Sequence, residues 1–397
     1  MRYVNLEKTH ITVSALGLGT MRFPLVDESS VLDEDAAIAV IRHALQAGIN
    51  YIDTAFTYHN GDSEVVVGKA LKGFQREKIV LTTKCPVWEI HSPNDFDRIL
   101  ETQIKKLDTD YLDCYLFHAL ENERWEGIKK LGLLEKAEKA KKIGLIRHIG
   151  FSFHDNLLTL KKIINEYNAW EICQLQYNYV DTNKQAGTEG ISYAKEKGLD
   201  VIVMEPLHGG RLVNPPEQVM NVLNHSKSPI EWAFDFLYDN SNIDVVLSGM
   251  SSIEEIDKNI YYADSAHRNM LTDIELEMFL KAKSIYDSMS RVMCTGCGYC
   301  MPCERQINIP IIMAAYNKSG STNYRNAKLD YDKLFPNASD CIACKKCEKK
   351  CPQKVEISKE MRHIEETFKK PLPDLDLESL KIKWPARYRK YLMDNKE

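Results

Sequence analysis

Eight of the eleven cysteines lie between residues 294 and 351, in two regularly spaced runs. The second run reads Cys-x2-Cys-x2-Cys-x3-Cys-Pro, a spacing typical of thiolates that hold 4Fe–4S clusters. The first run has three gaps of two residues and is followed by Glu304 instead of proline. This ladder of eight thiols favours iron–sulfur clusters over zinc, which takes four ligands. The predicted metal ligands are Cys294, Cys297, Cys300, Cys303, Cys341, Cys344, Cys347 and Cys351.

The two runs also predict how the thiols divide between two cubane clusters. In two-cluster sequences of this spacing, the last cysteine of a run reaches the cluster held by the other run. The expected sets are Cys294, Cys297, Cys300 and Cys351 for one cluster, and Cys341, Cys344, Cys347 and Cys303 for the other. Because the last gap of the first run is one residue short, this crosswise sharing is a hypothesis at this point.

Four polar side chains that suit acid catalysis end or follow predicted strands: Asp53, Tyr58, Lys84 and His118. The carboxyl ends of barrel strands meet at one mouth, so we expect these side chains to converge. A phenol titrates near about 10, and a neighbouring ammonium lowers that pKa by stabilising the phenolate. Asp53 would hold Lys84 charged and oriented. The group would protonate an alkoxide as hydride reaches a carbonyl carbon, with His118 hydrogen-bonded to the substrate oxygen.

Short apolar runs alternate with longer amphipathic stretches up to about residue 265. The runs suit strands that are covered on both faces, and eight strands each followed by a helix predict an α/β fold of the (β/α)8 TIM barrel type. No Gly-x-Gly-x-x-Gly follows the first strand, which disfavours an open doubly wound sheet. A hairpin before Leu16 is expected to close the barrel floor. The expected strands are Leu16–Thr20, Asn50–Thr54, Ile79–Lys84, Leu112–His118, Ile146–Ser152, Ile172–Gln176, Val201–Glu205 and Val245–Ser248. The expected helices include Asp35–Ala47, Asp95–Leu107, Trp125–Lys142 and Gln185–Lys197.

Three regions follow from these patterns. Residues 1–285 are expected to form the barrel, and residues 286–360 a C-terminal α-helical, ferredoxin-like iron–sulfur domain. Residues 361–397 are expected to form a charged, proline-containing tail. Between the cysteine runs, helices are expected at Ile311–Asn317 and Tyr324–Leu334.

The chain from Tyr3 to about Tyr262 resembles the aldo-keto reductase family. The most specific motif is Asn50–Tyr58 followed by Gly-Asp-Ser-Glu, and Thr83-Lys84 and Phe117-His118 match the positions of the family lysine and histidine. The resemblance implies a (β/α)8 fold, Tyr58 as general acid and a nicotinamide cofactor across the barrel mouth. The whole arrangement, down to about Phe368, is similar to a ferredoxin-containing branch of the family from anaerobic microbes. Further matches are Val13–Met21, Pro206–Leu212 and Ser248-Gly249.

The resemblance also implies a set of nicotinamide and nucleotide contacts. Three positions depart from the family pattern: Phe153 replaces an asparagine, Met204 an aromatic residue, and Ser252 an arginine that meets a 2′-phosphate. NAD(P)H is therefore one possible cofactor, and FMN is another. The candidate contacts are Thr20, Met21, Ser152, Gln174, Pro206, Leu207, Gly249, Ser252 and Asn259.

Composition limits the function classes. The chain has 397 residues, of which 44% are hydrophobic and 27% charged, so it can bury a large core. A net charge of −5 gives no reason to expect nucleic-acid binding. Neither an export-like start nor an 18-residue apolar run is present, so we expect a cytoplasmic protein without a membrane segment. Oxygen-sensitive cubanes would suit an anaerobe.

The leading hypothesis is an oxidoreductase that converts a small carbonyl/alcohol pair in the barrel, with two 4Fe–4S clusters carrying electrons. A first alternative replaces NAD(P)H by a flavin or by electrons taken directly from ferredoxin or another carrier. A second alternative is not an enzyme but an electron-transfer or redox-sensing protein with a vestigial barrel. The intact set of Asp53, Tyr58, Lys84 and His118 argues against the second alternative.

Overall fold

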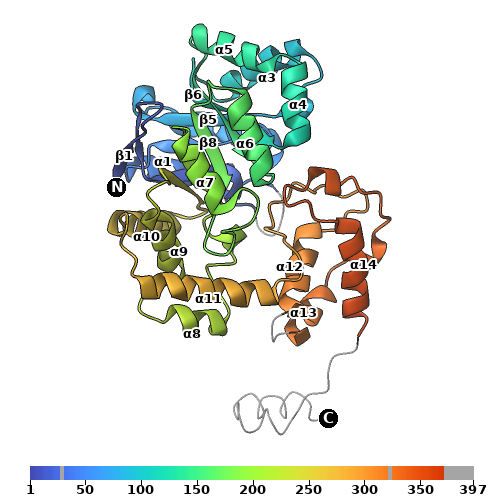
Figure 1. The fold of residues 1–397 in the computed structure, drawn as a ribbon. Coiled ribbons are helices and arrows are strands. Elements are labelled where there is room, and N and C mark those ends of the chain that lie inside the picture. The colour runs from blue at the N-terminus through green and yellow to red at the C-terminus, as the bar shows by residue number, and fades with distance from the viewer. Residues whose placement is uncertain (27–30, 321–323, 371–397) are drawn as a thin grey trace. The chain divides into compact units, whose positions relative to one another are not determined.

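The computed structural model describes residues 1–26, 31–320 and 324–370 (Figure 1). The chain divides into two compact units, Met1–Ser288 and Met289–Glu397. The first contains a closed barrel and the second contains short helices and cysteine-rich loops. The predicted fold class, a (β/α)8 barrel followed by a helical iron–sulfur region, is confirmed.

Eight parallel strands close the barrel in the order β10-β3-β4-β5-β6-β7-β8-β9. Neighbours in sequence pair in space, as Leu18 with Ile52 and Thr82 with Cys114 show. This topology brings all eight carboxyl ends to one rim. The strands are β3 Leu16–Gly19, β4 Tyr51–Asp53, β5 Val80–Cys85, β6 Leu112–Leu120, β7 Ile146–Phe153, β8 Ile172–Gln176, β9 Asp200–Met204 and β10 Val245–Gly249.

Helices follow the strands and surround them in the first unit (Figure 1). Their starts carry the expected caps: Ser228 caps α9 through the amide of Glu231, and Asp33 caps α1 through that of Ala36. The helices are α1 Glu34–Gln46, α2 Ser63–Leu71, α3 Pro93–Lys106, α4 Asn122–Lys130, α5 Leu133–Lys142, α6 Leu157–Glu166, α7 Gly187–Glu196, α8 Glu217–Leu223, α9 Pro229–Asp239, α10 Ile253–Ser265 and α11 Asp273–Met289.

The prediction of one helix over Trp125–Lys142 is wrong, because the chain forms α4 and α5 there. Gly132 lies between them with a φ of 62°, in the left-handed region that breaks a helix. The amphipathic pattern continues through this glycine, so periodicity alone did not reveal the break.

The predicted N-terminal hairpin is present as β1 Tyr3–Asn5 and β2 Thr12–Ser14. Leu6 and Val13 are buried in one cluster with Val80 and Val245, the first residues of β5 and β10. The hairpin therefore covers the amino ends of the strands and leaves their carboxyl ends for chemistry.

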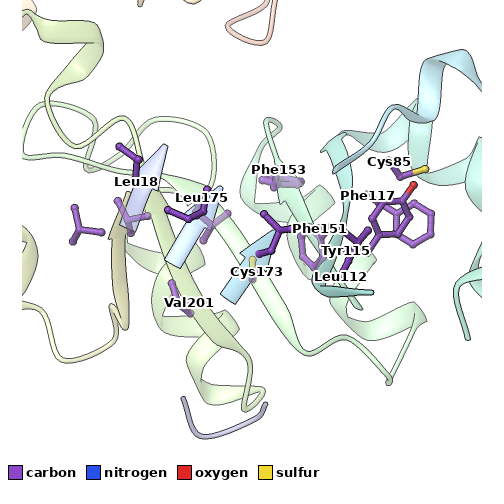
Figure 2. Packing of buried hydrophobic residues seen from close by; sticks show 14 of the residues in the cluster. Leu18, Cys85, Leu112, Tyr115, Phe117, Phe151, Phe153, Cys173, Leu175 and Val201 are labelled. Carbon is purple, nitrogen blue, oxygen red and sulfur yellow. The ribbon is translucent and has the colours of Figure 1, made fainter. Parts of the chain in front are cut away.

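The main core lies between the strands and the helices, and Figure 2 shows part of it. Aliphatic side chains make up most of it, together with a group of aromatic rings: the Phe151 ring centroid lies 4.8 Å from that of Trp170, and Phe117 meets Trp170 edge-on at 5.8 Å. Cys85 and Cys173 are completely buried in this core, and burial raises the pKa of Cys85 to about 12. These thiols are therefore packing groups, whereas Lys84, the strand neighbour of Cys85, points the other way.

The second unit has its own core, built around α12 Ile309–Gly320, α13 Tyr324–Tyr331 and α14 Ile357–Phe368. Phe368 stacks on Tyr331 with ring centroids 4.3 Å apart. The expected boundary at residue 360 falls inside α14, and we place the end of the packed unit at Phe368. Of the expected tail, residues 371–397 lie outside the described residues.

None of the helices in the described ranges combines the length and apolar character needed to cross a lipid bilayer.

Candidate functional site

The four predicted acid-catalysis residues converge at the carboxyl ends of β4, β5 and β6. Lys84 Nζ donates to Asp53 Oδ1 at 2.5 Å, to the Thr54 carbonyl at 2.9 Å and to the Tyr58 hydroxyl at 3.3 Å. Tyr58 begins the short 3-10 helix η2 Tyr58–Gly61, directly after β4. An ammonium has three protons, and these three acceptors account for all of them.

Asp53 and Lys84 form a buried ion pair, with side chains 5% and 1% exposed. A buried charge needs such compensation, because its desolvation is otherwise costly. Gln174 Nε2 donates to the second carboxylate oxygen of Asp53 at 2.9 Å. The predicted cofactor residue Gln174 therefore belongs to the same network as the predicted catalytic group.

His118 faces the Tyr58 ring nearly at right angles, with ring centroids 6.0 Å apart. The Trp88 ring lies 5.0 Å from it on another side. Burial, reinforced by the positive charge of Lys84, holds the pKa of His118 well below its usual 6.5. The imidazole is therefore neutral at physiological pH and can donate a hydrogen bond without carrying a charge.

A second histidine at the mouth, His154, was missed in the sequence. It directly follows β7 and is half-buried, and its buried Nδ1 atom has no hydrogen-bond partner among the described residues. Burial and the charge of Arg124 lower its pKa to about 4. Its position after the strand-ending Ser152 and Phe153 was a signal that could have identified it.

A further polar cluster lies after β8 and β9, around Asp181. This carboxylate accepts hydrogen bonds from Gln176 Nε2 at 2.9 Å, Asn178 Nδ2 at 3.0 Å and His208 Nδ1 at 2.7 Å. Burial alone would raise the pKa of Asp181, but the hydrogen bond and charge of His208 hold it below its ordinary value. The cluster fixes the loop after β9, which contains the predicted cofactor residues Pro206 and Leu207.

Two residues predicted to hold a nicotinamide carboxamide are at the mouth. The Ser152 hydroxyl accepts a hydrogen bond from the Ala119 amide at 2.7 Å. Gln174 Oε1 is buried and has no hydrogen-bond partner among the described residues. An unsatisfied acceptor of this kind is costly unless a ligand supplies a donor, and a carboxamide N–H is such a donor. The inner end of the mouth therefore fits a nicotinamide.

Residues predicted to contact the rest of the nucleotide are already hydrogen-bonded within the protein. Ser252 caps α10 through the Glu255 amide at 3.2 Å, and the Glu255 carboxylate accepts from the Ser251 amide at 2.7 Å. The start of α10 thus already holds a carboxylate where a phosphate would bind. Asn259 is buried and donates to the Ser248 hydroxyl at 3.2 Å.

The remaining predicted contacts lie at the edge where β3 meets β10. Gly19 pairs with Gly249, and a Cβ on Gly249 would come within 2.8 Å of the Arg22 side chain. Thr20 is buried and hydrogen-bonded to the Ser63 hydroxyl at 2.8 Å, and Met21 is partly buried next to it.

In the second unit, the eight predicted metal ligands line two separate cavities. We refer to them as cavity A, lined by Cys294, Cys297, Cys300 and Cys351, and cavity B, lined by Cys303, Cys341, Cys344 and Cys347. The structure thus brings together the two sets that the crosswise hypothesis names.

The other lining residues of the cavities are mostly apolar. Ile309 and Ile357 line both cavities, and Met313 and Val355 complete cavity A. In the described residues, no three His, Cys, Asp or Glu side chains are placed to hold a single metal ion. Four thiols facing one shared space, with no set that suits a single ion, fit a larger group such as a cubane.

Comparison with known proteins finds a family match for each of the two units. Residues 15–270 match the aldo/keto reductase family, and residues 293–356 match the 4Fe–4S dicluster domain. The NADH-specific methylglyoxal reductase of Escherichia coli (strain K12) is 30% identical over 237 residues, which cover 53% of this chain and 69% of that protein. The L-galactose dehydrogenase of Arabidopsis thaliana is 27% identical over 277 residues, which cover 64% of this chain and 86% of that protein.

The fold comparison gives the same result. The holo form of an aldo-keto reductase from Bacillus halodurans matches with a TM-score of 0.58 and 26% identity, over 71% of this chain and 96% of that one. This chain belongs to the aldo/keto reductase family, as its motifs predicted. It is an oxidoreductase with a C-terminal 4Fe–4S dicluster domain, so the non-enzymatic alternative is set aside.

Proposed function

We propose that this protein interconverts a small carbonyl compound and its alcohol at the barrel mouth, while two 4Fe–4S clusters in the second unit carry electrons. The observation that carries the proposal is the buried Lys84 ammonium, which donates both to Asp53 and to the Tyr58 hydroxyl. This contact makes a tyrosine, otherwise a weak acid, fit to give up its proton.

In the reduction, the Tyr58 hydroxyl donates its proton to the substrate oxygen as negative charge develops there. Lys84 stabilises the phenolate that remains, and Asp53 keeps Lys84 charged and in place. The neutral His118 donates a hydrogen bond to the same oxygen and orients the carbonyl. Trp88, packed on His118, forms an apolar wall that limits access of water.

Gln174 and Ser152 are the groups that would hold a nicotinamide, which supplies a hydride when bound. The unsatisfied Gln174 Oε1 supports this assignment, because it accepts a hydrogen bond that no described residue donates. The rest of the nucleotide would lie along residues of the β3 and β10 ends, the β9 loop and α10. These are Thr20, Met21, Pro206, Leu207, Gly249, Ser252 and Asn259.

The cysteines of cavities A and B would each hold one 4Fe–4S cluster. Each cubane passes one electron at a time, so two clusters store the two electrons that one carbonyl reduction consumes. When the clusters supply these electrons in place of a nicotinamide hydride, the reduction also consumes two protons: Tyr58 gives one to oxygen, and the other reaches carbon from solvent. Because air damages exposed cubanes, this role suits the cytoplasm of an anaerobe.

A second candidate keeps the enzyme but replaces the nicotinamide by a flavin such as FMN or by direct one-electron supply. Two observations favour it: the Ser152 hydroxyl is engaged by the Ala119 amide, and Glu255 occupies the start of α10. A flavin exchanges both single electrons and pairs, so it would connect the clusters with two-electron chemistry.

The test uses anaerobically purified protein with its clusters in place. Dithionite reduces the clusters, and candidate carbonyl compounds are added without nicotinamide while the cluster absorbance is followed. Reoxidation by a carbonyl substrate, with formation of its alcohol, is the expected result. Clusters that stay reduced with every substrate, in a protein that turns over fully with NADH, would contradict the electron-carrying role. A yellow chromophore that is released on denaturation would favour the flavin candidate.

A further inference from the structure

The two cysteine-lined cavities differ in their surroundings. Cavity A has no charged residue in its lining, whereas Glu304, Arg305 and Lys345 take part in the lining of cavity B. Cys344, in cavity B, is exposed, while the most buried cysteine of the two sets, Cys300, belongs to cavity A. A cluster in cavity B would therefore lie nearer to the surface of the second unit.

Lysines crowd the loop that forms cavity B. Between residues 345 and 359 there are six, all exposed: Lys345, Lys346, Lys349, Lys350, Lys354 and Lys359. Lys346 pairs with Glu304 at 2.7 Å, and Lys359 pairs with Glu356 at 3.1 Å. Lys345, Lys349 and Lys350 form no ion pair with any residue in the described ranges. The loop thus keeps an excess of positive charge although the whole chain carries −5.

Of the two acidic residues in this segment, Glu356 pairs with Lys359, and Glu348 does not neutralise the remaining charge at the surface. Glu348 turns toward α14, where its Oε1 accepts from the Ser358 amide at 2.8 Å and from the Ser358 hydroxyl at 2.5 Å. The turn is compact, since the Lys349 amide lies 3.5 Å from the Lys345 carbonyl. Lys346 pairs with Glu304, which lines cavity B, so this ammonium group lies close to the cavity.

An apolar patch lies among the lysines. Ile342 is 61% exposed, and the neighbouring Ala343 and Cys344 are exposed as well. A small apolar centre with a charged rim is the anatomy of a protein–protein interface. A lysine-rich face without such a centre would be read as an ordinary solvated surface.

We propose that this lysine face (Ile342, Cys344, Lys345, Lys349 and Lys350) docks an acidic one-electron carrier protein of the ferredoxin type. Charge complementarity steers the carrier to the face, and the exposed Ile342 and Cys344 bring its redox centre close to the cluster of cavity B. The proposal rests on the proposed function only in assuming that clusters occupy the cavities.

The electron balance is simple. A reduced carrier gives one electron to an oxidised cubane, and no bond forms or breaks in that step. Two docking events supply the two electrons of one carbonyl reduction. In the reverse reaction the same face would release two electrons to oxidised carrier.

The experiment measures binding and does not depend on turnover. Anaerobic holoprotein is titrated with an acidic bacterial two-cubane ferredoxin by calorimetry, at low and at high salt. The test variant is Lys345→Glu/Lys349→Glu/Lys350→Glu. The control variant, Lys130→Glu/Lys139→Glu/Lys142→Glu, changes three exposed lysines of α4 and α5 in the first unit and shifts the net charge equally.

We expect the test variant to raise the ferredoxin Kd at least tenfold, about 1.4 kcal/mol, and the control less than twofold. Binding by the parent protein should weaken steeply with salt, because screening acts on exposed charges. An unchanged iron content and an unchanged spectrum after dithionite reduction show that the variant has kept its clusters.

Equal loss in both variants, or unchanged binding in the test variant, would overturn the proposal. Tighter binding of phosphatidylserine vesicles than of ferredoxin, lost in the same variant, would overturn it in favour of a membrane surface. The outcomes separate it from the proposed function. If ferredoxin does not bind but dithionite-reduced protein still reduces a carbonyl, only the docking face is wrong. If ferredoxin binds but its electrons never reach a substrate, the docking face stands and the proposed function fails.

Discussion

At the scale of single residues, the Lys84 ammonium organises the barrel mouth. It is almost completely buried, and its three hydrogen bonds reach Asp53, the backbone after β4 and Tyr58. Removing one partner of a buried ion pair costs roughly 3–5 kcal/mol, because the other charge is left without compensation. Tests of the proposed chemistry are therefore safer at Tyr58, whose hydroxyl can be deleted with the ring kept.

The first prediction concerns this hydroxyl. Tyr58→Phe removes the proposed proton donor, and we expect carbonyl reduction to fall by about 10²–10⁴-fold, the usual range for general acid catalysis. Steady-state rates and the melting temperature are to be compared with Tyr261→Phe, which deletes a hydroxyl from an exposed ring. Near-normal reduction by Tyr58→Phe would show that another group is the acid.

The second prediction concerns pH. The pKa of His118 lies well below 6.5 and that of His154 at about 4, so the folded protein binds fewer protons at these groups than the unfolded chain does. Stability should therefore fall as the pH decreases from about 6.5 toward 4. Thermal unfolding followed by tryptophan fluorescence should show this slope, and His154→Asn should reduce it.

The matched control for this pH series is His225→Asn, a change at an exposed histidine, which should leave the slope as it is. Above pH 6.5 both imidazoles are neutral in both states, so parent protein and His154→Asn should differ by a constant amount. A His154→Asn slope equal to that of the parent would mean that His154 is not buried in its neutral form.

The residue scale also shows what the sequence could reveal. Asp53, Tyr58, Lys84 and His118 were found because each ends or follows an apolar strand, and strand ends meet at one rim. His154 carries the same signal, since it directly follows β7, and was overlooked. Asp181 was not found, since an aspartate in a loop has no local pattern that reports its burial. The engagement of the Ser251 amide by Glu255 depends on side-chain conformation, which spacing does not determine.

At the scale of elements, the start of α10 affects the relative affinity for NADH and NADPH. Glu254 and Glu255 lie in its first turn, and Glu255 accepts from Ser251. A carboxylate there repels a phosphate on the ribose, and Ser252 stands where the family has a basic residue. We therefore expect no tenfold preference for NADPH over NADH, in titration calorimetry of the holoprotein. If NADPH binds tenfold more tightly than NADH, a difference of about 1.4 kcal/mol, this account of α10 is contradicted.

Another element-scale feature is the attachment of the first cysteine run to α12. Asn317 is buried; its Oδ1 accepts from the Arg291 amide at 3.0 Å and the Val292 amide at 2.9 Å, and its Nδ2 donates to the Val292 carbonyl at 2.8 Å. These bonds fix the backbone just before Cys294. We expect Asn317→Ala to lower the iron content through cavity A first, measured by iron analysis after anaerobic purification.

The control for that variant is Asn308→Ala, at the other end of α12, where the side chain makes a single long contact of 3.4 Å to Ile311 N. It should keep the iron content of the parent. If both variants keep all their iron, the Asn317 bonds do not hold the first run in its binding conformation.

Elements were predictable to the extent that their signals are local. All eight strands were predicted in the right places because covered strands are short, apolar and β-branched. The α4–α5 break was missed because a glycine inside a helical pattern costs only about 1 kcal/mol and does not by itself end a helix. The helix α12 extends beyond the expected Ile311–Asn317, and α14 was not expected at all; apolar residues of both pack in the core of the second unit.

At the scale of the whole molecule, two cores in two units imply two separable contributions to stability. The core of the second unit packs against Cys294, Cys303, Cys341, Cys347 and Cys351, which are predicted metal ligands. Metal ligation contributes folding energy where ligands and core are shared in this way. Chelation of iron should therefore unfold the second unit and leave the barrel.

The last prediction is the iron count and its division. Anaerobic protein should contain about eight iron and eight sulfide per chain, as two cubanes do. Cys351→Ser and Cys294→Ser should impair the same cluster in spectra of the reduced protein, and Cys303→Ser should impair the other. Cys173→Ala, in the barrel core, should leave both clusters intact. Paired loss of Cys303 with Cys294 would show that each run holds its own cluster.

The lining of cavities A and B has a consequence for biosynthesis. Cavity A needs Cys351, which is made after every other cysteine of the chain, and cavity B needs Cys303 from the first run. Neither site is complete while the ribosome is still adding the residues between the runs. Cofactor delivery must therefore follow translation of this segment, because a chain that stops before residue 341 lacks ligands for both sites. The two clusters would then be inserted at the same stage of maturation.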